Sequence, residues 1–291
     1  MAAHKTSAVV DENEPLEVLF ALHPKFDLLD WAGPWEVFHS ALHDVNDPES
    51  KAFDCTIAAD EKTVLSDQDV SIVSQIPYKQ AYEDLKNYDV LVVVGGNTDE
   101  IIEKDAEPLG IISAFAELQK ADPVRERTLL SVCTGSHFLA QKGILAGLSA
   151  TTHPDYLTKF EILCSRAATR DLDERTDVQE NVRYVVNNLR FDLGNEDENP
   201  YIRRKSDARR PSNARKGSVS LRGSSTRENI ARRAAMRLGG LRVITASGVS
   251  AGTDAALYVV GALVDDESAN AVARRLNWTW QKGLVVDGVD V

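Results

Sequence analysis

The sequence predicts an α/β fold with a mostly parallel central sheet that helices cover on both faces. Short runs of continuous apolar and β-branched residues, such as 90–94 after Asp89, alternate with stretches of helical pattern, such as 109–120. Glycines or small residues stand where these apolar runs stop. Strands that are apolar throughout, rather than at every second residue, are typical of a sheet buried on both faces.

The elements follow one another in a regular order. The first strand is expected at 16–22, and a loop over 23–27 leads to a helix whose first turn holds Gly33 and Pro34, where a missing N–H costs little. Further strands are expected at 52–58, 70–73, 89–94, 128–132, 150–152, 182–186 and 241–246, and further helices at 109–120, 138–142, 250–263 and 267–280.

Composition describes an ordinary globular protein of 291 residues, with 43% hydrophobic and 7% aromatic residues. No apolar run approaches the length of about 18 residues that spans a bilayer, and the first residues carry no secretory signal, so we expect no membrane partner. Three cysteines without a C-x-x-C pair favour a reducing compartment, and we expect a cytoplasmic protein. One domain is expected over 16–282, with tails at 1–15 and 283–291.

A basic segment interrupts an acidic chain. The net charge is −12, but residues 188–240 hold 13 basic and 6 acidic side chains and few large apolar ones. This composition predicts a disordered insert. It is either a loop of no consequence, including a gene-model artefact, or a substrate of basophilic kinases at Ser206, Ser212 and Ser218, or a non-specific binder of anionic surfaces. Without interleaved aromatic residues, a nucleic-acid site is not expected.

Cys133 is the main candidate for chemistry. It follows the run Thr128-Leu129-Leu130 and precedes the helical pattern of 138–142, so it lies at a sharp turn between a strand and a helix. The first amides and the dipole of a helix favour an anion, and we expect them to lower the pKa of this thiol. The alternative is a buried cysteine that only packs, an interpretation that suits Cys55 and Cys164.

Two other loops are expected beside Cys133, because ligands gather at the carboxyl ends of parallel strands. Gly95 and Gly96 would let backbone amides stabilise a developing negative charge, or they form a plain turn. Asp30 stands among apolar neighbours, where burial would raise its pKa and suit it to proton transfer. Alternatively, Asp30 caps the helix that contains Pro34.

The histidines give no metal pattern. His137 follows Cys133 by one helical turn and His153 stands in Thr152-His153-Pro154, so both are candidates for the pocket. For both, a packed or capping role is the favoured interpretation.

Five segments together resemble the ThiJ/PfpI superfamily, and within it the isocyanide (isonitrile) hydratase branch. The resemblance covers about 16–187 and 241–282, with the basic insert outside it. One departure is Val94, where the family often has proline. The segments that carry the resemblance are 28–34, 94–96, 131–136, 143–153 and 245–254.

The resemblance implies a flavodoxin-like three-layer sandwich, a homodimer, and a nucleophilic cysteine at Cys133. It implies that Asp30 is the acid and that Thr134 orients the water or the intermediate. The thiolate of Cys133 would add to the terminal carbon of an isocyanide while Asp30 supplies a proton. Water would then release an N-substituted formamide, with neither a metal nor an organic cofactor.

Other activities of similar proteins fit less well or stay open. A glutamine amidotransferase needs a histidine late in the chain, and none follows His153. Peptidase-like members carry histidine directly after the cysteine, where this chain has Thr134. A cofactor-independent glyoxalase, usually with glutamate as its acid, is the enzymatic alternative. A non-enzymatic oxidation sensor based on Cys133 is the other.

Overall fold

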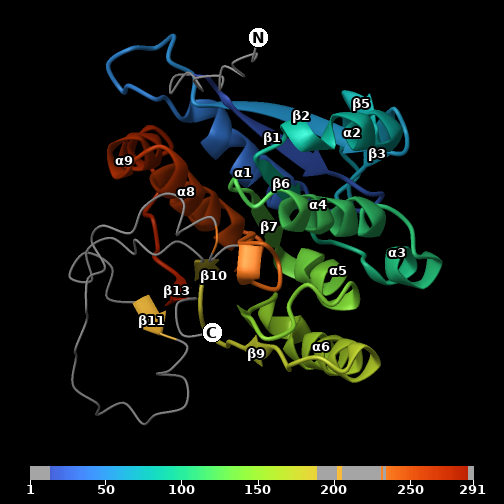
Figure 1. Ribbon diagram of the computed structural model, residues 1–291. Coiled ribbons are helices and arrows are strands. Elements are labelled where there is room, and N and C mark those ends of the chain that lie inside the picture. Colours follow the sequence, from blue (N-terminus) through green and yellow to red (C-terminus); the bar gives the residue numbers. More distant parts are fainter. Residues whose placement is uncertain (1–13, 189–201, 205–230, 232–233, 288–291) are drawn as a thin grey trace, which may run out of the picture.

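The computed structural model describes residues 14–188, 202–204, 231 and 234–287 (Figure 1). Within them the main sheet has nine strands in the order β11-β13-β10-β12-β7-β6-β1-β2-β5. All neighbouring pairs run parallel except β10 and β12. The expected α/β fold with a mostly parallel sheet is therefore confirmed.

The elements near the centre of the sheet alternate between strand and helix. The strands of the main sheet are β1 (Leu16–Ala21), β2 (Phe53–Ala59), β5 (Ile76–Pro77), β6 (Val90–Val93), β7 (Thr128–Val132), β10 (Tyr184–Asn188), β11 (Ile202–Arg204), β12 (Arg242–Ala246) and β13 (Leu284–Asp287). The α-helices are α1 (Leu28–Ser40), α2 (Tyr78–Asp84), α3 (Asp99–Lys104), α4 (Leu109–Ala121), α5 (Ser136–Gln141), α6 (Leu157–Asp171), α8 (Ala251–Leu263) and α9 (Asp266–Arg275). Two small sheets pair β3 (Thr63–Leu65) with β4 (Ser71–Val73) and β8 (Ser149–Ala150) with β9 (Asp177–Val178).

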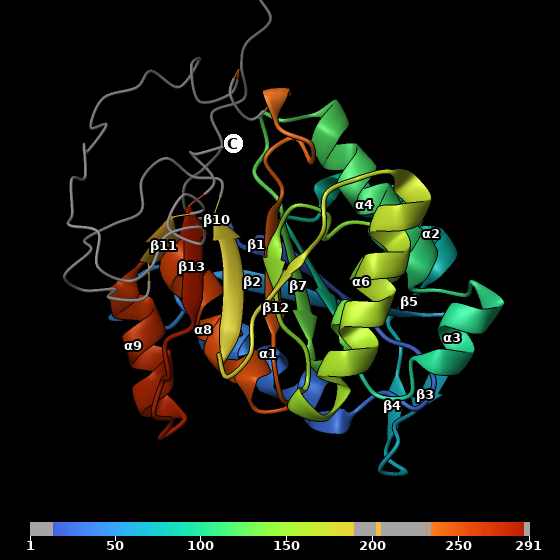
Figure 2. The ribbon, with the colours of Figure 1, turned by 90° about the horizontal axis from the view of Figure 1, so that it is seen from below.

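Helices cover both faces of the sheet, as Figure 2 shows. Helices α1, α8 and α9 pack together on one face, and α2, α4, α5 and α6 form the other layer. The strands divide their side chains accordingly, because successive residues point to opposite faces. In β6, for example, Val90 and Val92 join the core under α1 and α8, whereas Leu91 and Val93 join the core under α4 and α5.

The chain changes direction across the sheet between β1 and β6. Strand β1 lies between β2 and β6, so the chain first moves outward to β2 and then returns to the other side of β1. In such sheets a crevice forms outside the carboxyl ends of the two strands at the switch. The loops after β1, β6 and β7 meet at this edge, and backbone hydrogen bonds join the first two, from the Asp27 amide to the Gly95 carbonyl and from the Asn97 amide to the Lys25 carbonyl.

The first helix differs from the expected one. It begins at Leu28, so Pro34 lies in its interior and not in its first turn. The N-cap residue is Asp27, and Asp30 already belongs to the first turn. The interpretation of Asp30 as a helix cap is therefore wrong. Because Pro34 has no N–H, the carbonyl of Asp30 receives no helical hydrogen bond from it.

Other differences concern the second half of the chain. Helix α6 was not expected, because its apolar face is short and its mean character is polar. Helix α9 ends at Arg275, so Trp278 and Trp280 follow it instead of belonging to it. Residues Leu284–Asp287, expected in a tail, form β13 beside β10.

The expected insert is only partly described. Residues Ile202–Arg204 form β11, which pairs with β13, and the segment from Arg237 to Gly240 packs against the body of the fold. Ser206, Ser212 and Ser218, the expected kinase sites, lie outside the described residues. In the part of the chain that the structure describes, no helix has the length and apolar character needed to cross a bilayer.

Candidate active site

Cys133 occupies a strained turn at the end of β7. Its φ is +57°, a left-handed conformation that residues with a side chain adopt at a cost of about 1–3 kcal/mol. Two hydroxyl groups hold this turn, since Ser136 Oγ and Thr152 Oγ1 donate to the Cys133 carbonyl at 3.1 and 3.2 Å. Gly135 permits the turn because a side chain there would strike the Val93 carbonyl, only 2.7 Å away. The expected elbow is therefore present.

The Asp30 carboxyl lies beside this sulfur. The first turn of α1 places Asp30 under the loops of the sheet, where it is fully buried. Its Oδ2 accepts a hydrogen bond from the Gly95 amide at 2.9 Å. Its Oδ1 is buried and has no hydrogen-bond partner among the described residues. Donor atoms of Asp27, Asp30 and Cys133 all lie within 4.8 Å of one another.

Burial changes the titration of both groups in the same direction. Burial, with a contribution from the charge of Asp27, raises the pKa of Asp30 well above its ordinary value. Burial and then the Asp30 charge raise the pKa of the Cys133 thiol, although the amide and hydroxyl of Thr134 act against this. The expectation for Asp30 agrees with this result. The expectation of a lowered thiol pKa is wrong, because loss of hydration outweighs the helix terminus.

Gly95 and Gly96 have a different role from the expected one. The Gly95 amide donates to Asp30, and the Gly96 amide donates to Thr134 Oγ1 at 2.9 Å. Both N–H groups are thus already used, and the expectation that they await a developing negative charge is wrong. What the two glycines supply is space. A Cβ on Gly95 would lie 2.6 Å from Thr134 Oγ1 and 2.9 Å from Asp30 Oδ2, and Gly96 has a φ of +114°.

Thr134 connects the elbow to the loop after β6. Its hydroxyl donates to the Gly96 carbonyl at 3.0 Å and accepts from the Gly96 amide. Its proton is therefore directed at the protein backbone and not at a water position. Thr134 fixes the distance between the cysteine turn and the glycine pair, and through Gly95 also the position of Asp30.

The two candidate histidines differ in their surroundings. His137 is buried, its ring stacks on Phe160, and its Nδ1 lies 3.3 Å from Thr98 Oγ1. It is directed at α6 instead of at the elbow, and burial lowers its pKa to about 4. His153 is partly exposed and caps a short helical turn by accepting from the Asp155 amide. Its ring approaches Gly248 in the loop after β12, at the same edge of the sheet as Cys133.

Two residues that contact the site, His23 and Thr152, had no role expected from the sequence. His23 follows β1 and is buried, with Nε2 3.3 Å from the Val94 carbonyl just before the glycine pair. Thr152 was noted as part of a motif, and its bond to the Cys133 carbonyl emerges only from the fold. For His23, the sequence signal of a place in the site was its position at the end of a central strand.

One group of side chains could hold a metal ion in the described part of the chain, and it consists of Asp27, Asp30 and Cys133. A metal would have to displace protons from a thiol and a carboxyl whose pKa values are both raised. The three groups also lie close enough to exchange a proton with one another.

Comparison with known proteins agrees with this architecture. The model of the DJ-1/PfpI family matches residues 16–186. Isonitrile hydratase from Pseudomonas putida is 30% identical over 141 residues, which cover 48% of this chain and 54% of that protein. The chain thus matches about half the length of this curated relative.

Similar solved structures share the fold at low sequence identity. A ThiJ/PfpI family protein from Pseudomonas syringae has a TM-score of 0.52 at 18% identity, covering 97% of this chain and 84% of that one. DJ-1beta from Drosophila melanogaster has a TM-score of 0.53 at 15% identity, covering 92% of this chain and all of that one. These likenesses establish the flavodoxin-like fold alone.

Proposed function

The chain belongs to the DJ-1/PfpI family, and from this premise we propose that it adds water to isocyanides to give N-substituted formamides. The observation that carries the proposal is the pairing of Cys133, at a strained elbow, with a buried acid whose Oδ1 has no partner among the described residues. The partial similarity to isonitrile hydratase supports the same reaction.

The first step forms a carbon–sulfur bond. The sulfur of Cys133 attacks the terminal carbon of the isocyanide, and that carbon gains a proton from Asp30. The product is a thioimidate, whose carbon now carries both the sulfur of Cys133 and the added hydrogen. The step therefore needs one proton shared by the two groups, and their raised pKa values keep that proton present at neutral pH.

The second step uses the same acid as a base. Asp30, now a carboxylate, takes a proton from water as the water oxygen bonds to the thioimidate carbon, and it passes that proton to the nitrogen. Asp30 then takes the hydroxyl proton of the tetrahedral intermediate, and collapse of the intermediate expels the sulfur of Cys133 and gives the formamide. The proton count then returns to its starting value, so the cycle needs no external acid.

The surroundings of the sulfur suit such a substrate. Cys133 belongs to the apolar core between the sheet and helices α1 and α8, and the partly buried Leu28 and Trp31 pack against that core. Isocyanides are uncharged and need no charged partner. The pair that shares one proton carries the same net charge before and after hydration, so the cycle adds no charge to this buried region.

Two alternatives receive less support. Ready oxidation of a sensor cysteine requires thiolate character, and the raised pKa of Cys133 opposes it. Glyoxalase chemistry on small dicarbonyls would use the same cysteine and acid, so only an activity assay distinguishes it from isocyanide hydration. The homodimer implied by the family resemblance stays a prediction.

The test is to incubate the protein with a small alkyl isocyanide and follow the N-alkylformamide by NMR. We expect turnover by the wild type, and its loss in Cys133→Ala. We expect a loss of about 100- to 10,000-fold in Asp30→Asn, which keeps the shape of the acid but cannot exchange its proton. Cys164→Ala is the matched control, because this buried cysteine lies on α6 and should leave turnover unchanged.

Methylglyoxal is assayed in parallel. An inert wild type with isocyanide that consumes methylglyoxal would replace the proposal with the glyoxalase alternative. Equal turnover in Asp30→Asn and the wild type would remove the shared proton from the mechanism.

A further inference from the structure

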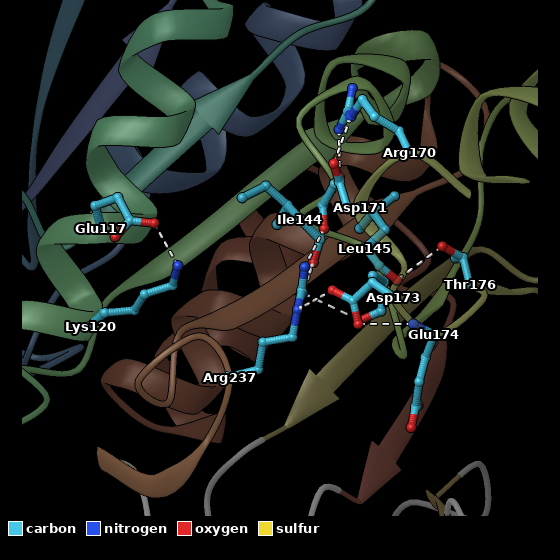
Figure 3. A network of polar contacts seen from close by, with 12 residues as sticks. Glu117, Lys120, Ile144, Leu145, Arg170, Asp171, Asp173, Glu174, Thr176 and Arg237 are labelled. Atoms are coloured by element: carbon cyan, nitrogen blue, oxygen red, sulfur yellow. Dashed lines mark hydrogen bonds and ion pairs between the residues drawn. The ribbon is translucent and has the colours of Figure 1, made fainter. Parts of the chain in front are cut away.

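Arg237 makes a dense set of contacts with the loop that follows α5 (Figure 3). Its Nη2 donates to the Gly143 carbonyl at 2.6 Å, and its Nη1 donates to the carbonyls of Ile144 and Ala146 at 3.2 and 3.3 Å. Its Nε donates to Asp173 Oδ2 at 2.9 Å. One side chain, from a segment that the sequence analysis assigned to a peripheral insert, thus uses all its nitrogens on the body of the fold.

Four successive carbonyls of the contacted loop, those of residues 143–146, accept hydrogen bonds from side chains. Between two carbonyls bound by Arg237, the Leu145 carbonyl accepts a hydrogen bond from Thr176 Oγ1 at 2.9 Å. Arg170 Nη1 binds the Gln141 carbonyl at the last residue of α5. Of these carbonyls, that of Gln141 belongs to the last turn of α5, where a helix leaves acceptors that require partners from elsewhere.

The same loop is connected to Cys133 at both ends. In one direction, α5 leads back to the elbow, and this helix has only six residues, too few to be stable without its surroundings. In the other direction, the loop continues through β8 to Thr152, whose hydroxyl donates to the Cys133 carbonyl. Residues 133–152 therefore form a closed circuit, with Cys133 at one end and Arg237 bound at the opposite end.

We propose that Arg237 is a positioning residue for Cys133. By fixing the far side of the circuit, it holds α5 and Thr152 in the arrangement that keeps the sulfur buried beside Asp30. The proposal rests on the proposed function in one respect, which is the role of Cys133 as nucleophile. It also makes the segment before β12 part of the catalytic framework instead of a peripheral loop.

The guanidinium is needed for its shape. Three backbone carbonyls and one carboxylate surround it, and a planar fork of fixed donors can serve all four at once. A lysine could place one ammonium near one or two of these acceptors. The conservative variant is thus expected to restore only part of the effect.

Loss of these contacts has a distinct signature at the sulfur. Burial is the main reason for the raised pKa of Cys133, so an elbow that opens to water gains thiolate character and reacts faster with an alkylating agent. Turnover of isocyanide should fall, because the sulfur and the acid lose their alignment. Faster alkylation together with slower turnover distinguishes positioning from direct catalysis.

The experiment measures alkylation of each cysteine by iodoacetamide, using peptide mass spectrometry between pH 6 and 10 (about the range in which thiols titrate). In Arg237→Ala we expect alkylation of Cys133 at neutral pH to rise about tenfold, with its midpoint moved to lower pH. We expect kcat to fall about 10- to 100-fold with little change in KM, since Arg237 does not touch the substrate. Arg237→Lys should give intermediate values.

Cys55 and Cys164 are internal controls, because both are buried in other elements and become reactive only if the whole fold opens. Arg175→Ala is the matched control, an exposed arginine in the connection after α6. If Arg237→Ala does not fold, Asp173→Asn keeps the carbonyl contacts and should show a smaller change in the same direction.

Two results would overturn the proposal. The first is a folded Arg237→Ala with the alkylation profile and turnover of the wild type. The second is equal acceleration of all three cysteines, which would mean that Arg237 only stabilises the fold. Because alkylation needs no isocyanide, either result is separable from a failure of the hydration assay.

Discussion

The substitution Gly95→Ala tests the packing that joins the acid to the nucleophile. A methyl group at this position would lie 2.6 Å from Thr134 Oγ1, 2.7 Å from the Thr134 backbone nitrogen and 2.9 Å from Asp30 Oδ2. Side-chain carbons do not approach other atoms so closely, and one of the three contacts belongs to backbone that cannot rotate away. The acid and the elbow must therefore separate.

The size of the effect follows from the displacement. Relief of three such contacts requires a shift approaching 1 Å, and misplacement on that scale costs about 100-fold in rate. Overpacking of a buried position costs about 1–3 kcal/mol in stability. For a chain of this length we expect a fall in Tm of about 2–10 °C. The assay is formamide production under saturating isocyanide, together with thermal unfolding.

Gly248→Ala is the matched control. A Cβ on Gly248 would meet only His153 Cδ2 at 4.0 Å, an ordinary contact, although this glycine also lies at the carboxyl edge of the sheet. We expect Gly248→Ala to keep the turnover and Tm of the wild type to within about twofold and 1 °C. If Gly95→Ala behaved like this control, the close approach of Asp30, Gly95 and Thr134 would not matter for the reaction.

Three further predictions concern buried charges. Asp30→Asn should raise Tm at neutral pH. A carboxyl whose pKa is raised in the folded state destabilises the fold as pH rises above the pKa of the unfolded chain, and the amide removes this cost. Thermal melts should show the gain in Tm shrinking toward pH 4, about the unfolded pKa, and a gain independent of pH would contradict the prediction. Asp27→Asn removes a charge that raises the pKa of both Asp30 and Cys133, so both limbs of the pH–rate profile should move to lower pH; an unmoved profile would refute that coupling. Asp254→Ala should lower the free energy of unfolding by about 3–5 kcal/mol, since Asp254 is fully buried and accepts hydrogen bonds from two nitrogens of Arg183. Denaturant unfolding measures this loss, and a loss below about 1 kcal/mol would mean that water replaces the pair.

Much of the central fold could be predicted because its information is local. The run 90–94 is apolar at every position, and most of it forms β6 with both faces buried. The elbow at Cys133 was visible as a strand, a turn and a helix in sequence order. Helix α6 was missed because it buries few side chains, among them Phe160 and Cys164, and the remainder of its surface is polar.

The edge of the sheet could not be predicted for a different reason. Strand β13 is short, and its partners β10 and β11 are distant in the sequence. Its apolar run has only three residues, Leu284, Val285 and Val286, which is too short to predict a strand without the partners that pair with it. Arg237 is a similar case, because a basic residue in a basic segment has no local mark of its carbonyl partners more than 90 positions earlier.

The candidate site shows where local reasoning reaches the right residues and the wrong chemistry. Asp30, Gly95 and Cys133 were expected to be neighbours, and the structure brings them together. The role of the glycines could not be read from the sequence, since it depends on which side chain reaches their amides. The Gly95 amide is bonded to the acid, so it serves the alignment of Asp30 and not the charge of an intermediate.

The state of the nucleophile follows from a comparison of magnitudes. A favourable helix terminus stabilises an anion by up to about 2 kcal/mol, which corresponds to roughly 1.5 pKa units. Burial can oppose this by about 3–5 units, and here a buried acid lies beside the sulfur as well. Burial therefore prevails, and Cys133 rests as a thiol. For addition to an isocyanide this is an advantage, because the proton that the substrate carbon must receive is already held between Cys133 and Asp30. A preformed thiolate would attack readily but would need a proton from elsewhere, in a region from which water is largely excluded.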